Sequence, residues 1–174
     1  MAGAVFLDLA AFYDSIQRDK LLEAAGRWGF PTGVLRLGLE MYAGPRHLQA
    51  GSFGSHPVWA RRGIMPGCSL CTSLAKLAVL EAMLSTVSQW PRVTIDIFID
   101  DLTFNAVGGR QQVTQDIGEA AESFAEKIRP MGCEVAPAKT AVVGSDAETA
   151  RALRLAVGGR ELRGAGGQDH FLGS

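Results

Sequence analysis

Two short apolar runs, each interrupted by aspartate, stand out in the pattern of hydrophobic and polar positions. The first run, residues 4–9, is apolar except for Asp8 and has the length of a strand that is buried on both faces. Alternation with a period of two puts Phe6 and Asp8 on one side of this strand. The other side takes three aliphatic residues: Val5, Leu7 and Leu9.

The second run, residues 95–104, is rich in β-branched and aromatic residues and predicts two strands joined around Asp100 and Asp101. The same alternation puts Asp96, Phe98 and Asp100 on one face. Two neighbouring strands would therefore each deliver a carboxylate at one end.

Amphipathic segments fill most of the remaining chain. Apolar spacing and end signals predict helices over residues 14–28, 31–43, 70–89 and 113–128. Asp14 and Gln17 have the spacing of an N-cap residue and its reciprocal partner. Turn signals predict a hairpin with strands 47–50 and 57–61, a glycine-rich turn over 63–67 and, beyond residue 147, a short helix and a loose hairpin at 158–167. This order predicts an α+β fold, an antiparallel sheet with helices packed on one face.

Composition narrows the class of protein. The 174 residues, 47% of them hydrophobic, are typical of one globular domain or a piece of one. No apolar run approaches a membrane span and no leader is readable, which predicts a soluble intracellular protein and leaves cytoplasm and nucleus open. A net charge of −1 points away from nucleic acid, unless an acidic catalytic core is separated from basic neighbouring parts.

The aspartates suggest the first chemical hypothesis. Within ten positions of the Asp100-Asp101 pair, the basic residues are Arg92 and Arg110 alone. A half-buried carboxylate without a counter-charge is costly, and a divalent ion such as Mg²⁺ is a natural partner for it. Together with Asp8, the pair would suit two metal ions in phosphoryl transfer. A plain hairpin turn is the alternative, because aspartate is common in turns.

Five motifs, in order, resemble those of the reverse transcriptases, and most closely the enzymes of non-LTR retrotransposons. The motifs are Phe6–Ile16, Arg62–Leu70, Phe98–Asp101, Gly132–Lys139 followed by Thr140, and Phe171–Gly173. The resemblance covers nearly the whole chain and implies a polymerase palm over residues 1–174. The fingers and thumb subdomains of the family would be absent or truncated.

The resemblance assigns catalytic roles. Asp8 and Asp100 would bind two Mg²⁺ ions, with Asp101 as a third carboxylate, the Leu9 carbonyl as a further ligand, and Mn²⁺ as an alternative metal. Lys139 resembles the lysine that protonates the pyrophosphate leaving group, a general-acid role. A solvated surface lysine is the competing interpretation.

The resemblance also assigns binding roles. Tyr13 would lie against the sugar of the incoming nucleotide and exclude a 2′-hydroxyl; packing in the core is the alternative. Gly63 and Gly67 would let the backbone approach template and nucleotide. The turn Met65-Pro66-Gly67 lacks the glutamine that many family members have before the glycine. The primer grip would use Phe171, Leu172 and Gly173.

The implied partners are an RNA template, a DNA primer and deoxynucleoside triphosphates, with no membrane; the oligomeric state is left open. A module that scaffolds nucleic acid without chemistry is one alternative to an active polymerase, and two further functions compete with it. One is a catalytically inactive retroelement fragment, which the altered turn and the missing subdomains favour. The other is a palm-like nucleotidyl cyclase, which would share the sheet and the carboxylates but not Tyr13 or the primer grip.

Overall fold

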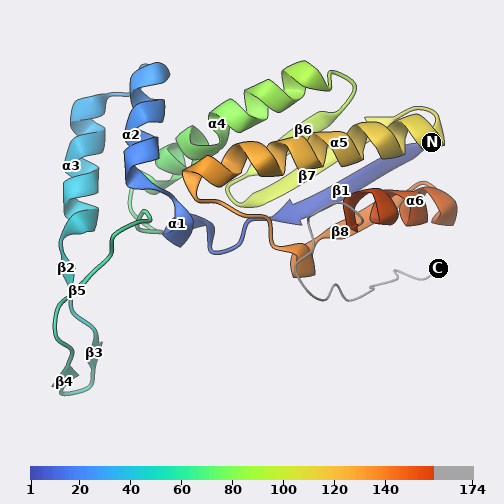
Figure 1. Ribbon diagram of the computed structural model, residues 1–174. Coiled ribbons are helices and arrows are strands. Elements are labelled where there is room, and N and C mark those ends of the chain that lie inside the picture. The colour runs from blue at the N-terminus through green and yellow to red at the C-terminus, as the bar shows by residue number, and fades with distance from the viewer. Residues whose placement is uncertain (159–174) are drawn as a thin grey trace.

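The computed structural model describes residues 1–158 and shows a four-stranded antiparallel sheet (Figure 1). Its strands are β1 (Ala2–Asp8), β6 (Thr94–Phe98), β7 (Asp101–Val107) and β8 (Ala141–Gly144). They lie in the order β6-β7-β1-β8, so the first strand is central and pairs with both β7 and β8. The strand predicted at residues 4–9 and the two strands predicted around Asp100 and Asp101 are confirmed.

Helices cover one face of this sheet (Figure 1). The helices among residues 1–158 are α1 (Phe12–Ser15), α2 (Arg18–Arg27), α3 (Thr32–Ala43), α4 (Cys71–Gln89), α5 (Arg110–Ile128) and α6 (Ala147–Gly158), with 3₁₀ turns η1 (Arg129–Met131) and η2 (Pro137–Lys139). Of these, α4, α5 and α6 lie on the sheet, whereas α2 and α3 lie beyond its end. α5 packs on β1 and β7, α6 on β1 and β8, and α4 on β6. The predicted α+β fold with helices on one face is confirmed.

The core lies between this face and the helices. Leu7 of β1 and Leu102 of β7 are buried there, and Phe104 meets Phe124 of α5 edge to face, with 5.8 Å between ring centroids. The opposite face is open: Phe6 is 42% exposed and Phe98 is 75% exposed. The prediction that β1 is buried on both faces is therefore wrong, because an antiparallel sheet needs helices on one side only.

The helix predicted to start at Asp14 begins elsewhere. Asp14 lies inside the four-residue α1, and α2 starts after Gln17 without a side-chain cap. Between the two helices Ile16 is extended and fully buried, and its carbonyl accepts a hydrogen bond from the Gly63 amide. The Gln17 amide donates to the carbonyl of Met131. Tertiary contacts therefore interrupt the helix and override the capping pattern.

A β-hairpin extends from the end of α3, and we call residues 44–62 the arm (Figure 1). Two short ladders form it: β2 (Pro45–Arg46) with β5 (Val58–Trp59), and β3 (Gln49–Ala50) with β4 (Phe53–Gly54). The predicted hairpin is confirmed in place, but its turn is the two residues Gly51-Ser52, with Gly51 at a positive φ of 61°.

α4 also bears on the membrane prediction. Among residues 1–158, it is the one helix long and apolar enough to cross a membrane by length and composition. This corrects the expectation that no apolar run approaches that length. Its side chains Leu74, Leu77 and Val79 are buried in the core, as in the central helix of a globular domain. The hairpin predicted at 158–167 falls mostly outside the described residues, and the primer-grip residues Phe171, Leu172 and Gly173 lie wholly outside them.

Candidate active site at the end of the open sheet face

Strand register brings Asp8 and Asp101 directly opposite each other on the open face of the sheet. They form the last pair of the antiparallel β1–β7 ladder, and Asp101 also pairs with Phe98 of β6. Directly paired residues point to the same face, and their Cβ atoms are about 5 Å apart. Asp101, and not Asp100, thus shares the face of Asp96 and Phe98, which corrects the predicted alternation.

The alternation fails because Ile99 and Asp100 form a two-residue hairpin turn. Ile99 has a positive φ of 63°, a rare conformation for a β-branched residue. The Asp100 carbonyl accepts a hydrogen bond of 3.2 Å from the Leu9 amide, which ties the turn to the end of β1. Ala11, at φ 44°, is the other non-glycine residue with positive φ within residues 1–158. Both lie beside the aspartates, and such backbone strain is typical of functional sites.

A lysine that is distant in sequence meets Asp8. The Lys139 ammonium lies 2.9 Å from Asp8 Oδ2; the Asp8 side chain is 16% exposed and that of Lys139 is 68% exposed. Asp8 raises the pKa of Lys139 above its ordinary value, and the charges of Asp100 and Asp101 add to this effect. The sequence around Asp100 and Asp101 offers no close cation, and the cation of the cluster comes instead from Lys139 of η2, far along the sequence.

The donor chemistry of this cluster fits a divalent cation. Asp8 Oδ2 is buried and accepts no hydrogen bond of regular geometry from the described residues, so its contact with Lys139 is one of charge. Residues 1–158 contain no group of three Asp, Glu, His or Cys side chains that could hold a metal ion alone. Mg²⁺ does not need one, because it commonly combines one or two carboxylates with waters and substrate phosphates. The Leu9 carbonyl is the further ligand that the motif resemblance predicts. In residues 1–158 it accepts none of the backbone hydrogen bonds that form outside helices and strands.

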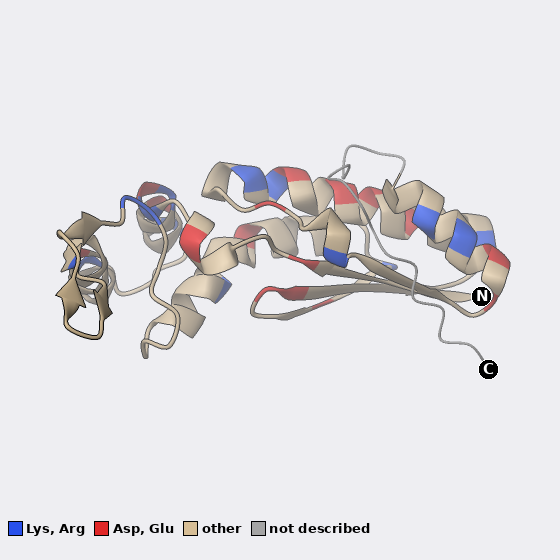
Figure 2. Ribbon diagram, turned by 90° about the horizontal axis from the view of Figure 1, so that it is seen from below, with Lys and Arg blue, Asp and Glu red and all other residues tan. Residues whose placement is uncertain are grey.

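Figure 2 shows acidic residues at the tip of the β6–β7 hairpin, on the side of the sheet that no helix covers. The open face therefore ends in concentrated negative charge, with the ammonium of Lys139 beside it.

Replacing Lys139 with methionine is expected to lower the midpoint of thermal unfolding in EDTA, because the half-buried Asp8 carboxylate loses its counter-charge. Mg²⁺ should then raise the midpoint more in this variant than in the unchanged protein, since the ion no longer competes with the ammonium. Thermal melts with and without Mg²⁺ measure both effects.

Lys20→Met is the matched control for this substitution. Lys20 also makes a 2.9 Å ion pair, with Glu23 on the same helix, away from the carboxylate cluster. Equal Mg²⁺ responses of Lys139→Met and the unchanged protein would show that the ammonium and the metal do not share a position.

Tyr13 lies close to the cluster and is half-buried. Its ring packs against Phe12, with 5.6 Å between centroids, and its pKa is raised by burial and by the charges of Cys71 and Asp100. Tyr13 is thus partly a packing residue, and the charge of Asp100 acts on it; its role against a nucleotide sugar stays a prediction.

The two predicted glycines differ in what surrounds them. A Cβ on Gly63 would come within 2.9 Å of the Tyr13 carbonyl oxygen and of the Asp14 Cα. Glycine is therefore required at position 63 by packing against the protein's own backbone. A Cβ on Gly67, at φ 84°, would meet no atom within 4 Å, so this α-carbon faces open space. Of the two, only Gly67 leaves room for another molecule to approach.

Arg18 was missed by sequence reasoning, because nothing in its neighbourhood marks it. Its guanidinium joins α2 to the end of α3 and to the segment before the glycine-rich turn by donating to four backbone carbonyls: those of Tyr42, Ala60, Arg62 and Gly63. The two cysteines in that region are packing residues: Cys71 is buried, and the half-buried Cys68 is 2.7 Å from the Tyr42 hydroxyl.

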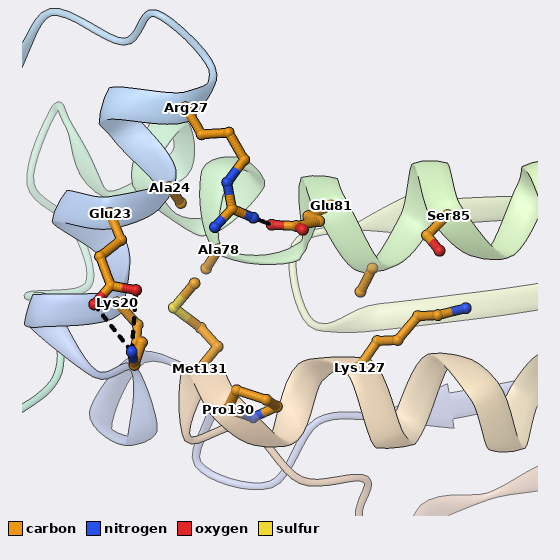
Figure 3. A pocket seen from close by; sticks show the side chains of 11 residues that line it. Lys20, Glu23, Ala24, Arg27, Ala78, Glu81, Ser85, Lys127, Pro130 and Met131 are labelled. Carbon is orange, nitrogen blue, oxygen red and sulfur yellow. Dashed lines mark hydrogen bonds and ion pairs between the residues drawn. The ribbon is translucent and has the colours of Figure 1, made fainter.

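A cavity of about 420 Å³ lies elsewhere, between α2, α4 and the end of α5 (Figure 3). Two ion pairs border it, Lys20 with Glu23 and Arg27 with Glu81. No predicted site residue lines it. The cavity is therefore separate from the carboxylate cluster.

The architecture and the carboxylates define a palm-type fold with an acidic site at the end of an open sheet face. The model of the family "Reverse transcriptase (RNA-dependent DNA polymerase)" matches residues 2–156, so the chain belongs to the reverse transcriptase family, as the motifs predicted. No curated protein matches the chain.

Two solved structures share the fold. One is telomerase from Candida tropicalis in complex with a TWJ fragment of telomeric RNA, with TM-score 0.64, 11% identity and coverage of 84% of this chain and 26% of that one. The other is apo telomerase from the same organism, truncated from its C-terminal domain, with TM-score 0.52, 13% identity and coverage of 83% and 32%. The predicted polymerase palm fold is thereby confirmed, and the chain spans about a quarter to a third of these structures.

Proposed function

We propose that this chain is the palm of an RNA-directed DNA polymerase from a non-LTR retroelement, spanning residues 1–174. It adds deoxynucleotides to a primer 3′-hydroxyl on an RNA template. Membership of the reverse transcriptase family supports the reaction class. The observation that carries the proposal is the Asp8–Asp101 pair, which lies beside Asp100 and Lys139 at the end of an open sheet face.

The carboxylates supply the charge that the reaction needs. Two divalent ions, when bound, would activate the primer 3′-hydroxyl and stabilise the pyrophosphate leaving group. Asp8 and Asp101 project from paired strand ends, whose ladder fixes their spacing, and Asp100 is held by the bond from the Leu9 amide to its carbonyl. Rigid strand ends of this kind hold ligands with little loss of entropy on binding.

Lys139 has two roles in this proposal. Without metal, its ammonium neutralises Asp8. During the reaction it donates a proton to the leaving pyrophosphate, since a lysine ammonium is protonated at neutral pH. The exposure of Lys139 lets the side chain leave Asp8 and reach a substrate.

Tyr13 and Gly67 shape the nucleotide position. The Tyr13 ring, fixed against Phe12 and near Asp100, would exclude a 2′-hydroxyl and so select deoxynucleotides. The open space at Gly67 would admit the nucleotide or the template base. Gly63 belongs to this region through its own packing against the Tyr13-Asp14 backbone.

Primer extension on poly(rA)/oligo(dT) with Mg²⁺ tests the function. The chain should extend the primer, and replacement of both Asp100 and Asp101 by alanine should abolish extension. Asp96→Asn, an exposed aspartate on the same face, is the control and should extend normally. No extension by the unchanged chain would refute the proposal that it acts as an enzyme alone, and extension by the double variant would refute the site.

A further inference from the structure

The arm has a charge distribution unlike the rest of the chain. Residues 41–80 contain no aspartate or glutamate, although the whole chain has a net charge of −1. They contain four basic residues: Arg46, Arg61, Arg62 and Lys76. Three of the four lie in the arm. A segment with cations and no anions attracts a polyanion and has no internal partner for its charge.

Large apolar side chains of the arm point into solvent. Phe53, near the tip, is 80% exposed and Trp59 is 60% exposed, and Leu48 and Val58 are exposed as well. In a monomeric protein such a set marks a binding surface. Aromatic rings interleaved with cations suit unpaired nucleotides, because bases stack on the rings while arginines contact phosphates.

The base of the arm contains an arginine without a partner for one of its donors. Arg46 Nε is buried and makes no hydrogen bond within the described residues. The neighbouring Arg18 cannot accept a hydrogen bond from it, because a guanidinium carries donors only, and four backbone carbonyls already accept those of Arg18. Burial first, and then the like charge of Arg46, lower the pKa of Arg18. An anion here would satisfy Arg46 and relieve the repulsion.

The position of the arm relates it to the carboxylate site. The arm extends from α3 beyond the end of the sheet at which β1 ends, which is also the end where Asp8 and Asp101 pair (Figure 1). The turn from Gly63 to Gly67 connects the arm to the neighbourhood of Tyr13, since the Ile64 amide donates to the Tyr13 carbonyl. A strand held on the arm can therefore continue toward the open face.

We propose that the arm binds the unpaired RNA template strand: Phe53 and Trp59 stack on its bases, and Arg46, Arg61 and Arg62 contact its phosphates. The identity of that strand rests on the proposed polymerase function. Charge complementarity selects this occupant over a protein partner. Duplex RNA fits less well, because its bases are stacked on one another and offer no free faces to the rings.

Binding of fluorescein-labelled oligo(rU) of about 16 nucleotides, measured by anisotropy in EDTA, tests this proposal without the metal site. Phe53→Ala and Trp59→Ala should each weaken binding about tenfold, and Trp59 fluorescence should be quenched by the oligonucleotide. Arg46→Gln should lower the slope of log K against log salt by about 0.7, the loss of one phosphate contact to a single strand. An oligo(rU)·oligo(rA) duplex should bind more weakly.

Trp28→Phe and Arg151→Gln are matched controls, because both residues are exposed and lie outside the arm. They should bind like the unchanged protein, and thermal melts check that every variant is folded. The proposal is overturned if the unchanged chain does not bind oligo(rU), if the arm variants bind as it does, or if duplex binds equally well. Failure of primer extension with intact arm-dependent binding would instead refute the polymerase function alone.

Discussion

Asp8→Asn is expected to lower templated addition of dNTPs by at least about a thousandfold while leaving the fold intact. The substitution keeps the shape of the side chain but removes the charge that would hold a divalent ion. Metal ions contribute several kcal/mol to charge stabilisation in the transition state, and about 4 kcal/mol corresponds to a factor of about a thousand. Single-turnover primer extension measures the effect.

Asp96→Asn again provides the comparison, since Asp96 is exposed on the same open face but does not belong to the ladder end. Its extension rate should stay within about twofold of the unchanged protein, as expected for an isolated surface substitution. A similar loss in both variants would mean that the overall negative charge of the face matters and not the position of Asp8.

Gly132→Ala is expected to destabilise the protein by about 2–5 kcal/mol. Gly132 has a φ of 87°, and a Cβ there would come within 2.4 Å of the Ser15 carbonyl oxygen. The left-handed conformation costs about 1–2 kcal/mol for an alanine, and overpacking adds about 1–3 kcal/mol. Urea unfolding followed by circular dichroism gives the change in the free energy of unfolding.

Gly29→Ala separates the two contributions. Gly29 has a comparable φ of 67°, but nothing lies within 4 Å of its Cβ position. This variant should lose only the conformational part, about 1–2 kcal/mol. Equal losses in the two variants would show that the end of α1 at Ser15 moves to accommodate the new methyl group.

The sequence predicts the order of strands and helices well, because each element has a clear period and the sheet is covered on one side only. It also predicts Asp8, Asp100 and Asp101 as neighbours, and the strand that ends at Asp8 does pair with the strand that begins at Asp101. The sequence does not predict on which face of the sheet each aspartate lies. The turn of the hairpin depends on Ile99 adopting a positive φ, which is the opposite of what its side chain prefers.

Contacts between distant segments are the other gap. The capping pattern at Asp14 is a local signal, and it fails because Ile16 and Gln17 bond to the segments at Gly63 and Met131. The pairing of Lys139 with Asp8 and the four carbonyl contacts of Arg18 likewise depend on where separate loops meet. No periodicity in the sequence predicts such contacts between distant segments.

The residue-for-residue pairing of β1 with β7, from Ala2 with Val107 to Asp8 with Asp101, has an evolutionary consequence. A single insertion or deletion within either strand would turn every side chain beyond it to the other face of the sheet, and would move one of the paired aspartates into the core. Substitutions on the open face carry no such penalty. Related chains should therefore vary in the identity of residues along these strands while keeping their length, and length changes should gather in the arm.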